Sequence, residues 1–392
     1  MSVKPKVLVF IVGGEGWGGI ESFVLNLCKE LSNSDVQIDV ISSDATGLKR
    51  HEEEFNRYHV RVYDLNIRGN MVIRKLKAYS EILRFLRTHD YSAIHINTSN
   101  MFAELPVLFA AKKAGMQTRI VHSHNTTMDV DHALKKILRK CTMALNLGRK
   151  AIGKAATHYL ACSQPAAEWL FSEQLVQAGQ VKLVNNGIDA NEFRYAPEIR
   201  AEYRRQLGLD GKFVIGNIGR FNYQKNHDFL LDVFCEIHNR HPESVLLLVG
   251  EGELKAELQA KVTRLQLTDS VCFLGLRADV PQLLQAMDVF VLPSHFEGLP
   301  VVAIEVQAAG LRTFLSDAVT EEAAITDLVA YLSLAQSAEV WAETILQCKD
   351  NCAHRDMYEE IMAAGYDMKD TAKWMERFYL QQGGENGEYT SN

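Results

Sequence analysis

The sequence of 392 residues lacks the features that mark several special classes of protein. No window approaches about 18 consecutive apolar residues, so we expect no helix that spans a bilayer. The apolar run near the start is too short for a secretory signal peptide. With only 8 prolines, no low-complexity tract and no regular repeat, fibrous and solenoid architectures are excluded. The seven cysteines form no Cys-x-x-Cys pair, which favours reduced thiols in a cytoplasmic protein.

The composition is that of an ordinary globular protein, with 47% hydrophobic and 23% charged residues. The length exceeds what one core usually supports, so we expect two domains. The net charge of −7 is unevenly distributed. Residues 1–195 hold 25 lysines and arginines against 19 aspartates and glutamates, a balance of +6 that leaves −13 for residues 196–392. We therefore expect the first half to face an anionic surface or a phosphate-bearing substrate.

Apolar, β-branched runs alternate with helical patterns along the whole chain, which is typical of parallel sheets with helices on both faces. The pattern predicts strands near residues 6–12, 36–42, 59–63, 92–96, 118–122, 158–162, 181–184, 213–218, 245–249, 270–273, 288–292 and 312–315. The sequence therefore predicts an α/β protein of doubly wound, Rossmann-like domains. Their ligands should bind in a cleft lined by loops at the carboxyl ends of the strands.

The alternation loosens once, in the charged stretch NGIDANEFRYAPEIRAEYRRQLGLDGK at 186–212, which reads as a connection between domains. We place an N-terminal domain at 1–190 and a C-terminal domain at 191–365. A last helix at 366–382 carries an apolar stripe that includes Trp374, Phe378 and Tyr379. Residues 383–392 should be disordered.

The first strand is followed by a glycine-rich turn, Gly14-Glu15-Gly16-Trp17-Gly18-Gly19, and by a helical pattern from Ile20. Glycines let a backbone approach a phosphate closely, and a helix start directs N–H groups towards it. The spacing fits G-x-G-x-x-G, and Asp44 at the end of the next strand lies about where a ribose-binding carboxylate is expected. These residues alone leave open a dinucleotide site and a plain strand-to-helix turn.

Two cations follow the first strand of the second domain, in the segment IGNIGRFNYQKNHDF. Arg220 and Lys225 lie beside the start of the next helix, where a forked guanidinium and a compact ammonium can together bind a diphosphate. The alternative is a solvated pair of loop charges.

Two carboxylates lie eight residues apart in EGLPVVAIE: Glu297 in a loop after a strand, and Glu305 inside the helix opened by Pro300. In a continuous helix that spacing is roughly 12 Å along the axis. A glycosidase pair must converge on one bond at roughly 5 to 10 Å, which this placement does not favour. Two separate hydroxyl-bearing groups, a sugar and a ribose, suit it better.

Six short segments, taken together, resemble the motifs of the large retaining glycosyltransferase family 4, whose members have the two-domain GT-B architecture. They are GGxE at Gly18, Gly19 and Glu21, NNGID at 185–189, GR…KN at 219–226, GEGELKAEL from Gly250, FLGLRADV from Phe273, and EGLPVVAIE, which looks like the family's E-x7-E motif. The resemblance runs from residue 6 to about 380. The segment after EGLPVVAIE departs from the GxPV…DxGG run of many members and looks like the branch found in bacterial capsule and exopolysaccharide clusters.

The resemblance implies roles for these residues. Arg220 and Lys225 bind the donor diphosphate and stabilise the charge that grows on it, Glu297 contacts the transferred sugar, and Glu305 contacts the ribose. His124 orients the sugar, and GT-B enzymes return their last helix to the first domain. The remaining donor-binding positions are Gly18, Gly19, Gly219, Asn226, Gly250, Glu251, Gly252, Leu276, Arg277, Gly298, Leu299, Pro300 and Val301. An NAD-binding interpretation gives no role to the two cations or the two carboxylates.

The pair His122 and His124 raises the question of a metal. We expect the two imidazoles to point to opposite faces at the strand end, and no Asp or Cys partner lies nearby in the sequence. The chain has no DxD-type acidic pair where metal-dependent transferases carry one. We therefore expect no metal and no cofactor, with cations and a helix start in their place, as the family implies.

Residues 132–167 contain no Asp or Glu, while basic residues crowd a helical pattern there: Lys135, Lys136, Arg139, Lys140, Arg149, Lys150 and Lys154. A second basic cluster lies in an earlier helix: Arg68, Arg74, Lys75, Lys77, Arg84 and Arg87. Two interpretations are open, an acceptor side that meets the inner face of the cytoplasmic membrane and an ordinary solvated face.

The sequence thus predicts a retaining, metal-independent glycosyltransferase that moves a hexose or N-acetylhexosamine from a UDP-sugar. The acceptor expected from the resemblance is a glycan on a polyprenyl diphosphate, or a soluble glycan, and no nucleic acid is involved. The alternatives are a non-catalytic sugar- or nucleotide-sugar-binding partner of the same fold, a phosphorylase or epimerase, and an NAD-dependent enzyme.

Overall fold

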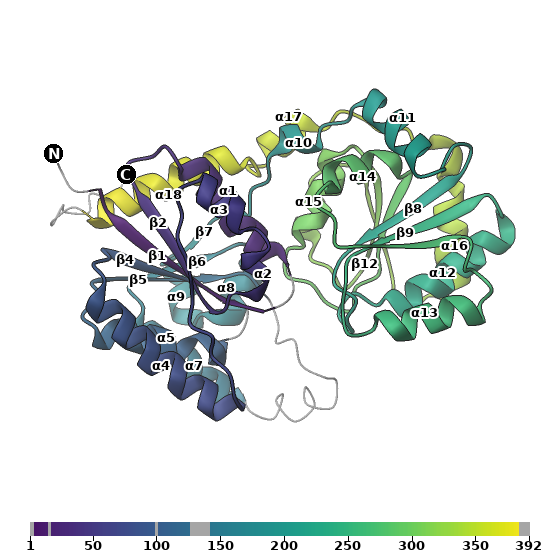
Figure 1. Ribbon diagram of the computed structural model, residues 1–392. Helices are drawn as coiled ribbons and strands as arrows, with labels where there is room; N and C mark the ends of the chain where they lie inside the picture. The colour runs from purple at the N-terminus through teal and green to yellow at the C-terminus, as the bar shows by residue number, and fades with distance from the viewer. Residues whose placement is uncertain (1–3, 15–16, 99–100, 126–141, 384–392) are drawn as a thin grey trace. The chain divides into compact units, whose positions relative to one another are not determined.

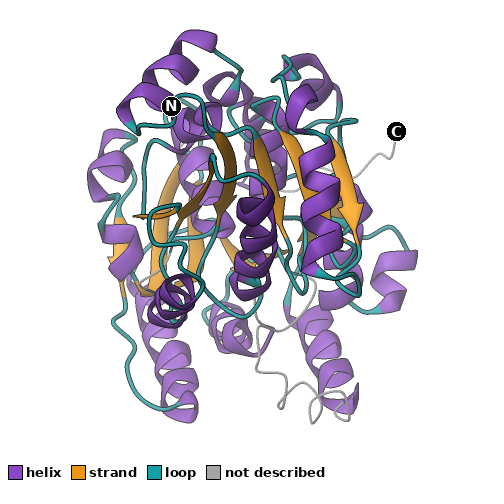
Figure 2. Cartoon of the chain, turned by 90° about the vertical axis from the view of Figure 1, so that its right-hand side faces the viewer, coloured by secondary structure: helices purple, strands orange, loops and turns teal. Residues whose placement is uncertain are grey.

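The computed structural model describes residues 4–14, 17–98, 101–125 and 142–383. The chain forms two compact units (Figure 1). Unit 1 is Met1–Gly187 with Met368–Asn392, and unit 2 is Ile188–Asp367. Figure 2 shows strands (orange) among helices (purple), as the alternating sequence pattern predicts. None of the helices in the described ranges is long and apolar enough to cross a bilayer.

Unit 1 contains a seven-stranded parallel sheet in the order β3-β2-β1-β4-β5-β6-β7. Its central strands are continuous apolar or buried runs, because helices cover both of their faces. The strands are β1 (Lys6–Gly13), β2 (Gln37–Asp44), β3 (Val62–Asp64), β4 (Ala93–Thr98), β5 (Thr118–Ser123), β6 (His158–Ala161) and β7 (Val181–Leu183).

The helices of unit 1 include the last helix of the chain, α18 (Met368–Gly383). Met368, Ala372, Met375 and Tyr379 of α18 are buried in the same core as residues of the sheet and of α1, which confirms that the C-terminal helix returns to the first domain. The other helices are α1 (Gly19–Leu31), α2 (Thr46–Lys49), α3 (Glu52–Arg57), α4 (Met71–Thr88), α5 (Met101–Lys113), α7 (Thr142–Ala155), α8 (Gln164–Leu170) and α9 (Glu173–Gln177).

Unit 2 contains a six-stranded parallel sheet in the order β10-β9-β8-β11-β12-β13. The strands are β8 (Phe213–Ile218), β9 (Ser244–Val249), β10 (Val271–Gly275), β11 (Val289–Leu292), β12 (Arg312–Ser316) and β13 (Val329–Leu332). The sequence pattern did not predict β13. All four residues of this edge strand are only partly buried, so its apolar run is too short and too exposed to stand out.

The helices of unit 2 surround this sheet and its core, in which Trp341 and Phe234 are fully buried. They are α10 (Ala190–Phe193), α11 (Pro197–Gln206), α12 (His227–Arg240), α13 (Lys255–Arg264), α14 (Val280–Ala286), α15 (Val301–Ala308), α16 (Ala338–Gln347), α17 (Tyr358–Ala363) and the short 3₁₀ helices η2 (Glu321–Ala323) and η3 (Lys349–Asn351).

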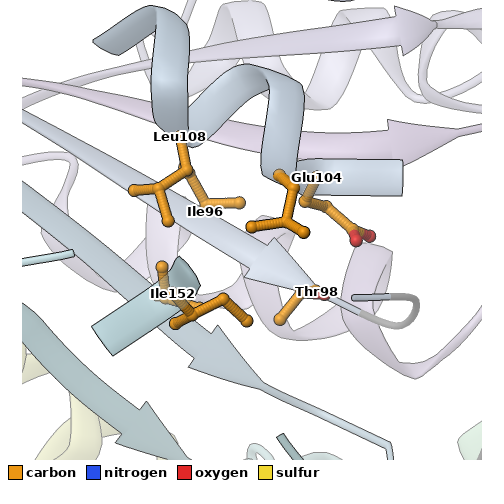
Figure 3. Close-up of a pocket in the computed structure, with 7 residues that line it drawn as sticks. Ile96, Thr98, Glu104, Leu108 and Ile152 are labelled. Carbon is orange, nitrogen blue, oxygen red and sulfur yellow. The ribbon is translucent and has the colours of Figure 1, made fainter. Parts of the chain in front are cut away.

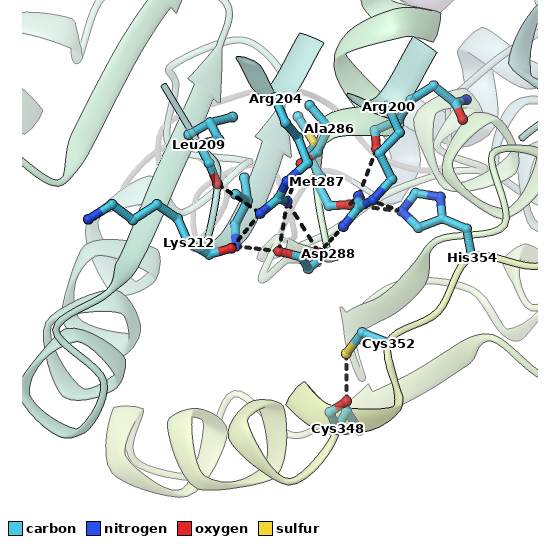
Figure 4. A network of polar contacts seen from close by, with 12 residues as sticks. Arg200, Arg204, Leu209, Lys212, Ala286, Met287, Asp288, Cys348, Cys352 and His354 are labelled. Atoms are coloured by element: carbon cyan, nitrogen blue, oxygen red, sulfur yellow. Dashed lines mark hydrogen bonds and ion pairs between the residues drawn. The ribbon is translucent and has the colours of Figure 1, made fainter. Parts of the chain in front are cut away.

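The stretch predicted as a connection contains a helix, α11, that is fixed to unit 2 by its arginines (Figure 4). Arg200 and Arg204 both form ion pairs with Asp288, which begins the approach to β11. The Asp288 carboxylate also accepts the backbone N–H of Val214 at 2.7 Å. This carboxylate therefore ties α11 to the amino end of the sheet, away from the ends where the predicted site residues lie.

Both sheets reverse their strand order at one place, between β1 and β4 in unit 1 and between β8 and β11 in unit 2. In open parallel sheets the crevice at this switch point, outside the carboxyl ends of the strands, is where ligands bind. The fold thus directs attention to two loop clusters, one in each unit.

Candidate functional site

In unit 2 the predicted donor-binding residues gather at the carboxyl edge of the sheet. Backbone hydrogen bonds join the loops that follow β8, β9 and β10: Gly219 N–H donates to Val249, Phe221 N–H to Glu251, and Gly250 N–H to Gly275, at 2.9 to 3.0 Å. The parallel order of the strands brings these loops side by side although they are far apart in the sequence. The edge is therefore one connected surface.

Two of its glycines are required by close approach of backbones. Gly250 has φ of +141°, and a Cβ there would lie 2.0 Å from the Gly219 carbonyl oxygen. A Cβ on Gly252 would lie 2.3 Å from the carbonyl oxygen of Phe221. Any side chain at either position would separate the loops after β8 and β9, so glycine keeps this edge compact.

A buried ion pair of this edge joins the loops on either side of the switch point. The Lys225 ammonium, after β8, lies 2.7 Å from Oε1 of Glu297, after β11. Their side chains are only 15% and 6% exposed. The same carboxylate accepts the hydroxyl of Ser294 at 2.7 Å and the amide of Gln224 at 2.9 Å. Lys225 is thus held in a defined position instead of swinging freely in solvent.

Asn226 fixes the backbone beside this pair. It adopts a left-handed conformation, with φ of 54°, immediately before α12, and its amide donates to the Pro293 carbonyl oxygen at 3.0 Å. Asparagine is among the few residues other than glycine that adopt this conformation readily. The residue therefore ends the β8 loop, starts α12 and ties both to the loop after β11.

Arg220 occupies a different environment from Lys225. Its guanidinium lies 3.2 Å from Glu253 in an ion pair whose side chains are 59% and 55% exposed. Exposed pairs of this kind contribute ~1 kcal/mol or less, so a ligand anion can replace Glu253 at little cost. The same loop therefore carries one exposed cation, Arg220, and one largely buried cation, Lys225.

Glu305 lies on α15, which begins at Val301 after Gly298, Leu299 and Pro300. Burial raises the pKa of its carboxyl to about 7, and the nearby Lys225 charge partly opposes this rise. A carboxyl of this kind is close to half protonated at neutral pH, so binding of a hydroxyl-bearing group can change its charge. The remaining donor positions lie at the same edge, with Leu276 49% exposed after β10 and Arg277 paired with Asp279 at 2.5 Å.

In unit 1 the glycine-rich turn lies at the carboxyl end of β1. Gly18 precedes α1 and Gly19 is its first residue; both are exposed, and the N–H of Gly18 donates to the Glu21 carboxylate at 3.0 Å. Glu15 and Gly16 lie outside the described residues. The Asp44 carboxylate accepts both the N–H and the hydroxyl of Thr46, at 3.0 and 2.6 Å, so it serves the local turn into α2. That contact lowers the pKa of Asp44.

The expectation that His122 and His124 point to opposite faces is wrong. Their ring centroids are 4.0 Å apart, because residues two apart along an extended chain lie on the same face. Nevertheless, in the described ranges no group of three His, Cys, Asp or Glu side chains is placed to hold a metal ion. His124 is buried, and its Nε2 lies 2.8 Å from the side-chain oxygen of Asn97. Burial lowers its pKa to about 3, so the imidazole is neutral.

Sequence reasoning missed several buried polar residues around His124. His95 and Asn97 lie on β4, Thr98 ends it, and Asn186 follows β7; all four are at most 4% exposed. The polar residues of AIHINT, which alternate with apolar residues in β4, were a signal that could have identified the first three. These side chains make the part of the unit 1 edge around His124 polar but uncharged.

A small cavity lies beside this edge, lined by residues of β4, α5 and α7 that include Ile96, Thr98, Glu104, Leu108 and Ile152 (Figure 3). Its volume of about 10 Å³ is no larger than one water molecule. It is therefore a packing defect and has no room for a sugar. The predicted acceptor-side residues Lys135, Lys136, Arg139 and Lys140 lie outside the described residues.

Comparison with known proteins defines the class first. Two doubly wound units of this kind occur in solved GT-B structures: HepE of Anabaena in complex with UDP-glucose has a TM-score of 0.75 at 20% identity, covering 96% of this chain and 99% of that one. WaaG, a glycosyltransferase involved in lipopolysaccharide biosynthesis, has a TM-score of 0.71 at 14% identity, covering 95% and 99%. The fold is therefore GT-B.

The sequence comparisons define the family. Residues 17–192 match the model for Glycosyltransferase Family 4, and residues 199–365 match that for Glycosyl transferases group 1. The protein EpsF of Bacillus subtilis (strain 168) is 32% identical over 381 residues, 94% of each chain. An Escherichia coli enzyme named UDP-Gal:alpha-D-GlcNAc-diphosphoundecaprenol alpha-1,3-galactosyltransferase is 27% identical over 307 residues, 76% of each. The chain belongs to glycosyltransferase family 4 and is a glycosyltransferase.

Proposed function

We propose that this enzyme transfers a hexose or N-acetylhexosamine from a UDP-sugar to a glycan carried on a polyprenyl diphosphate, in the synthesis of a capsule or exopolysaccharide. The transfer retains the anomeric configuration and needs no metal ion. The observation that carries the proposal is the ion pair between Lys225 and Glu297, which spans the switch point of unit 2.

The ion pair suits a donor whose diphosphate and sugar lie next to each other. Lys225 offers a fixed positive charge to the diphosphate, and the Glu297 carboxylate accepts hydrogen bonds from hydroxyls of the sugar. Arg220 adds a second cation from the same loop once it leaves Glu253. As the glycosidic bond breaks, negative charge grows on the diphosphate, and prepositioned cations stabilise it. Two cations supply the charge that a divalent metal supplies in other transferases, which is why we propose metal independence.

The uncharged groups around His124 in unit 1 suit the transferred sugar. Neutral imidazole and amide groups of His124, Asn97 and Asn186 can exchange hydrogen bonds with sugar hydroxyls without attracting an anion. In the proposed enzyme His124 contacts the transferred sugar and Glu305 the ribose. We propose no covalent nucleophile: as in the family, the leaving group and the acceptor react on the same face of the sugar.

The relatives support UDP and a lipid-linked acceptor. HepE was crystallised with UDP-glucose and with UDP, and the name of the Escherichia coli enzyme specifies UDP-galactose and a diphosphoundecaprenol acceptor. The Salmonella typhi protein VipC/TviE, which is 32% identical over 37% of this chain, is named for Vi polysaccharide biosynthesis. These names favour the polysaccharide branch of the family.

A lipid-linked acceptor requires the enzyme to reach a membrane, and α4 offers a suitable surface. Val72 and Leu76, one turn apart, are 64% and 67% exposed. Arg74 and Lys77 on the same helix are exposed as well. An exposed apolar pair among basic residues suits the interface of an anionic bilayer. We propose peripheral association with the inner face of the cytoplasmic membrane through α4.

Vesicle sedimentation tests this surface. The wild type should bind vesicles with phosphatidylglycerol and not vesicles of phosphatidylcholine alone, and the double variant Val72→Ser/Leu76→Ser should bind several-fold less. Val340→Ser, which changes an exposed apolar residue of α16 in unit 2, is the matched control and should bind like the wild type. Equal binding by the double variant and the wild type would exclude α4 as the membrane surface.

The transfer itself is tested with a panel of UDP- and GDP-sugars and synthetic polyprenyl-diphosphate glycans, in EDTA, with products identified by mass. A UDP-sugar should give a product one sugar heavier, and the anomeric coupling in the NMR spectrum should match the donor. Activity only with GDP-sugars, only with added metal, or with inversion would contradict the corresponding part of the proposal.

A further inference from the structure

A row of buried polar side chains runs through unit 1 from the last helix to the site. The Tyr379 hydroxyl of α18 lies 2.6 Å from Nδ1 of His95 on β4, and Nε2 of His95 lies 3.3 Å from Nδ1 of His122 on β5. The ring of His122 lies against that of His124, with centroids 4.0 Å apart. Tyr379 is 1% exposed, and His95 and His122 are fully buried.

One arrangement of the protons is consistent with both hydrogen bonds of the row. Burial lowers the pKa of His95 to about 3 and that of His122 well below its usual value, so each ring is neutral and has one N–H. Burial also raises the pKa of Tyr379, which keeps its O–H. If the tyrosine donates to Nδ1 of His95, then His95 must donate from Nε2 to Nδ1 of His122. Each hydrogen bond of the row then has one donor and one acceptor.

The row ends at His124, the residue that the proposed function assigns to the transferred sugar. His124 is enclosed by the His122 ring, by Asn97 at 2.8 Å and by Phe23, whose ring centroid is 5.3 Å away. Phe23 also contacts the edge of His122, at 5.5 Å. A rotation of His122 therefore displaces His124 or Phe23, and the hydrogen bond from His95 opposes that rotation.

Stability alone does not require polar side chains at the positions of this row. The surrounding core is apolar and includes Phe23, Leu27, Cys28 and Met375. Apolar side chains of similar volume often pack in such a place with equal or better stability, whereas polar groups fix one arrangement. The tyrosine also lies on α18, which starts where the chain returns from unit 2 to unit 1.

We propose that Tyr379, acting through His95 and His122, is a positioning residue that holds His124 in its orientation for the transferred sugar. The inference rests on the proposed function in one respect, the contact between His124 and the sugar. The arrangement of protons in the row does not depend on it.

The decisive variant is Tyr379→Phe, which removes one hydroxyl and keeps the ring. We expect kcat for transfer to fall by about tenfold, the size typical of a lost positioning contact, with KM for the UDP-sugar within twofold because unit 2 holds the nucleotide. Phe378→Leu on the same helix, a partly buried residue outside the row, is the matched control. It should lower Tm by at least as much and leave kcat unchanged.

A rescue pair tests the relay through His95. His95→Gln retains an amide N–H that can reach His122, and kcat should stay near the wild-type value. His95→Leu has no donor, and kcat should fall as in Tyr379→Phe. Equal losses in the two variants would show that the ring is needed only for packing.

Long-range ¹H–¹⁵N NMR of the imidazole rings provides a readout that needs no activity. In the wild type, His95 and His122 should each carry their proton on Nε2, and Tyr379→Phe should mix the two tautomers of His95 and shift the ring signals of His124. Unchanged tautomers and unchanged His124 signals would overturn the proposal. If the wild type transfers no sugar, the proposed function fails while these spectra still decide whether the row positions His124.

Discussion

The six strands of the unit 2 sheet follow the same order as the first six strands of the unit 1 sheet, but the residues beside the two switch points differ in charge. At the switch point of unit 2, a buried ammonium and carboxylate, Lys225 and Glu297, form an ion pair. At the switch point of unit 1, neutral groups such as His124 and Asn97 are hydrogen-bonded to each other. The fold supplies the same crevice twice, and the loop residues decide what each crevice can bind. A charged edge suits a diphosphate, and an uncharged polar edge suits sugar hydroxyls.

The largest expected effect comes from removing the fixed cation of unit 2. Lys225→Ala should reduce transfer by at least about 10²-fold to 10³-fold, the usual loss when one group that stabilises transition-state charge is removed. Product formation is measured by mass. Lys212→Ala is the matched control, because Lys212 pairs with Glu243 at the amino end of the same sheet. Equal activity in the two variants would show that a cation at the carboxyl edge matters no more for transfer than one at the amino end of this sheet.

Arg220→Ala should have a smaller effect, about tenfold in transfer, because its side chain is exposed and its charge is screened by solvent and salt. The contribution of Arg220 should shrink further between 50 mM and 500 mM salt, while that of Lys225 should persist. Rates of both variants across that salt range measure the difference. A larger loss of transfer in Arg220→Ala than in Lys225→Ala would show that the exposed arginine, and not the buried lysine, binds the diphosphate.

Glu305 should couple donor binding to pH. Burial raises its folded-state pKa from 4.5 to about 7, so stability that is complete below about pH 4.5 is lost as the pH rises to about 7. Glu305→Gln should therefore raise the free energy of unfolding at pH 8, by up to ~3 kcal/mol, and yet weaken UDP binding there. Urea unfolding and calorimetry at pH 6 and 8 measure the two quantities. If Glu305→Gln is less stable than the wild type at pH 8, the pKa of Glu305 is not raised in the folded protein.

The smallest effect is expected for the neutral histidines of unit 1. It concerns how the free energy of unfolding changes at acid pH. Burial lowers the pKa of His95 and His124 to about 3, whereas in the unfolded chain a histidine titrates near 6.5. Their contribution to stability is complete above about pH 6.5 and is lost as the pH falls towards 3. His95→Gln should show a shallower decline in unfolding free energy between pH 7 and 5 than the wild type. A steeper decline would mean that the imidazole is charged in the folded protein.

Much of this contrast could be predicted from the sequence. All twelve predicted strands are present with ends within about three residues, because continuous apolar runs are a strong local signal. Lys225 and Glu297 were each predicted at the carboxyl edge for the same reason. Their direct contact could not be predicted, because 72 residues separate them and only the strand order of the sheet brings their loops together.

The uncharged edge was harder to predict. His122 and His124 were placed on opposite faces, and the row from Tyr379 to His122 joins residues up to 284 positions apart that carry no common motif. Buried polar residues are specified by their partners, and a single sequence does not show which residues become partners. The edge strand β13 was missed because its packing, not its composition, makes it a strand.

The central claim is that the donor diphosphate binds to the charged edge of unit 2 without a metal ion. Calorimetric titration of UDP and of uridine into the wild type and Lys225→Ala, in EDTA, tests it most directly. The account predicts that UDP binds the variant at least about tenfold more weakly than the wild type, while the affinity for uridine is unchanged. Equal UDP affinity in the two proteins, or UDP binding that appears only when a divalent cation is added, would contradict it.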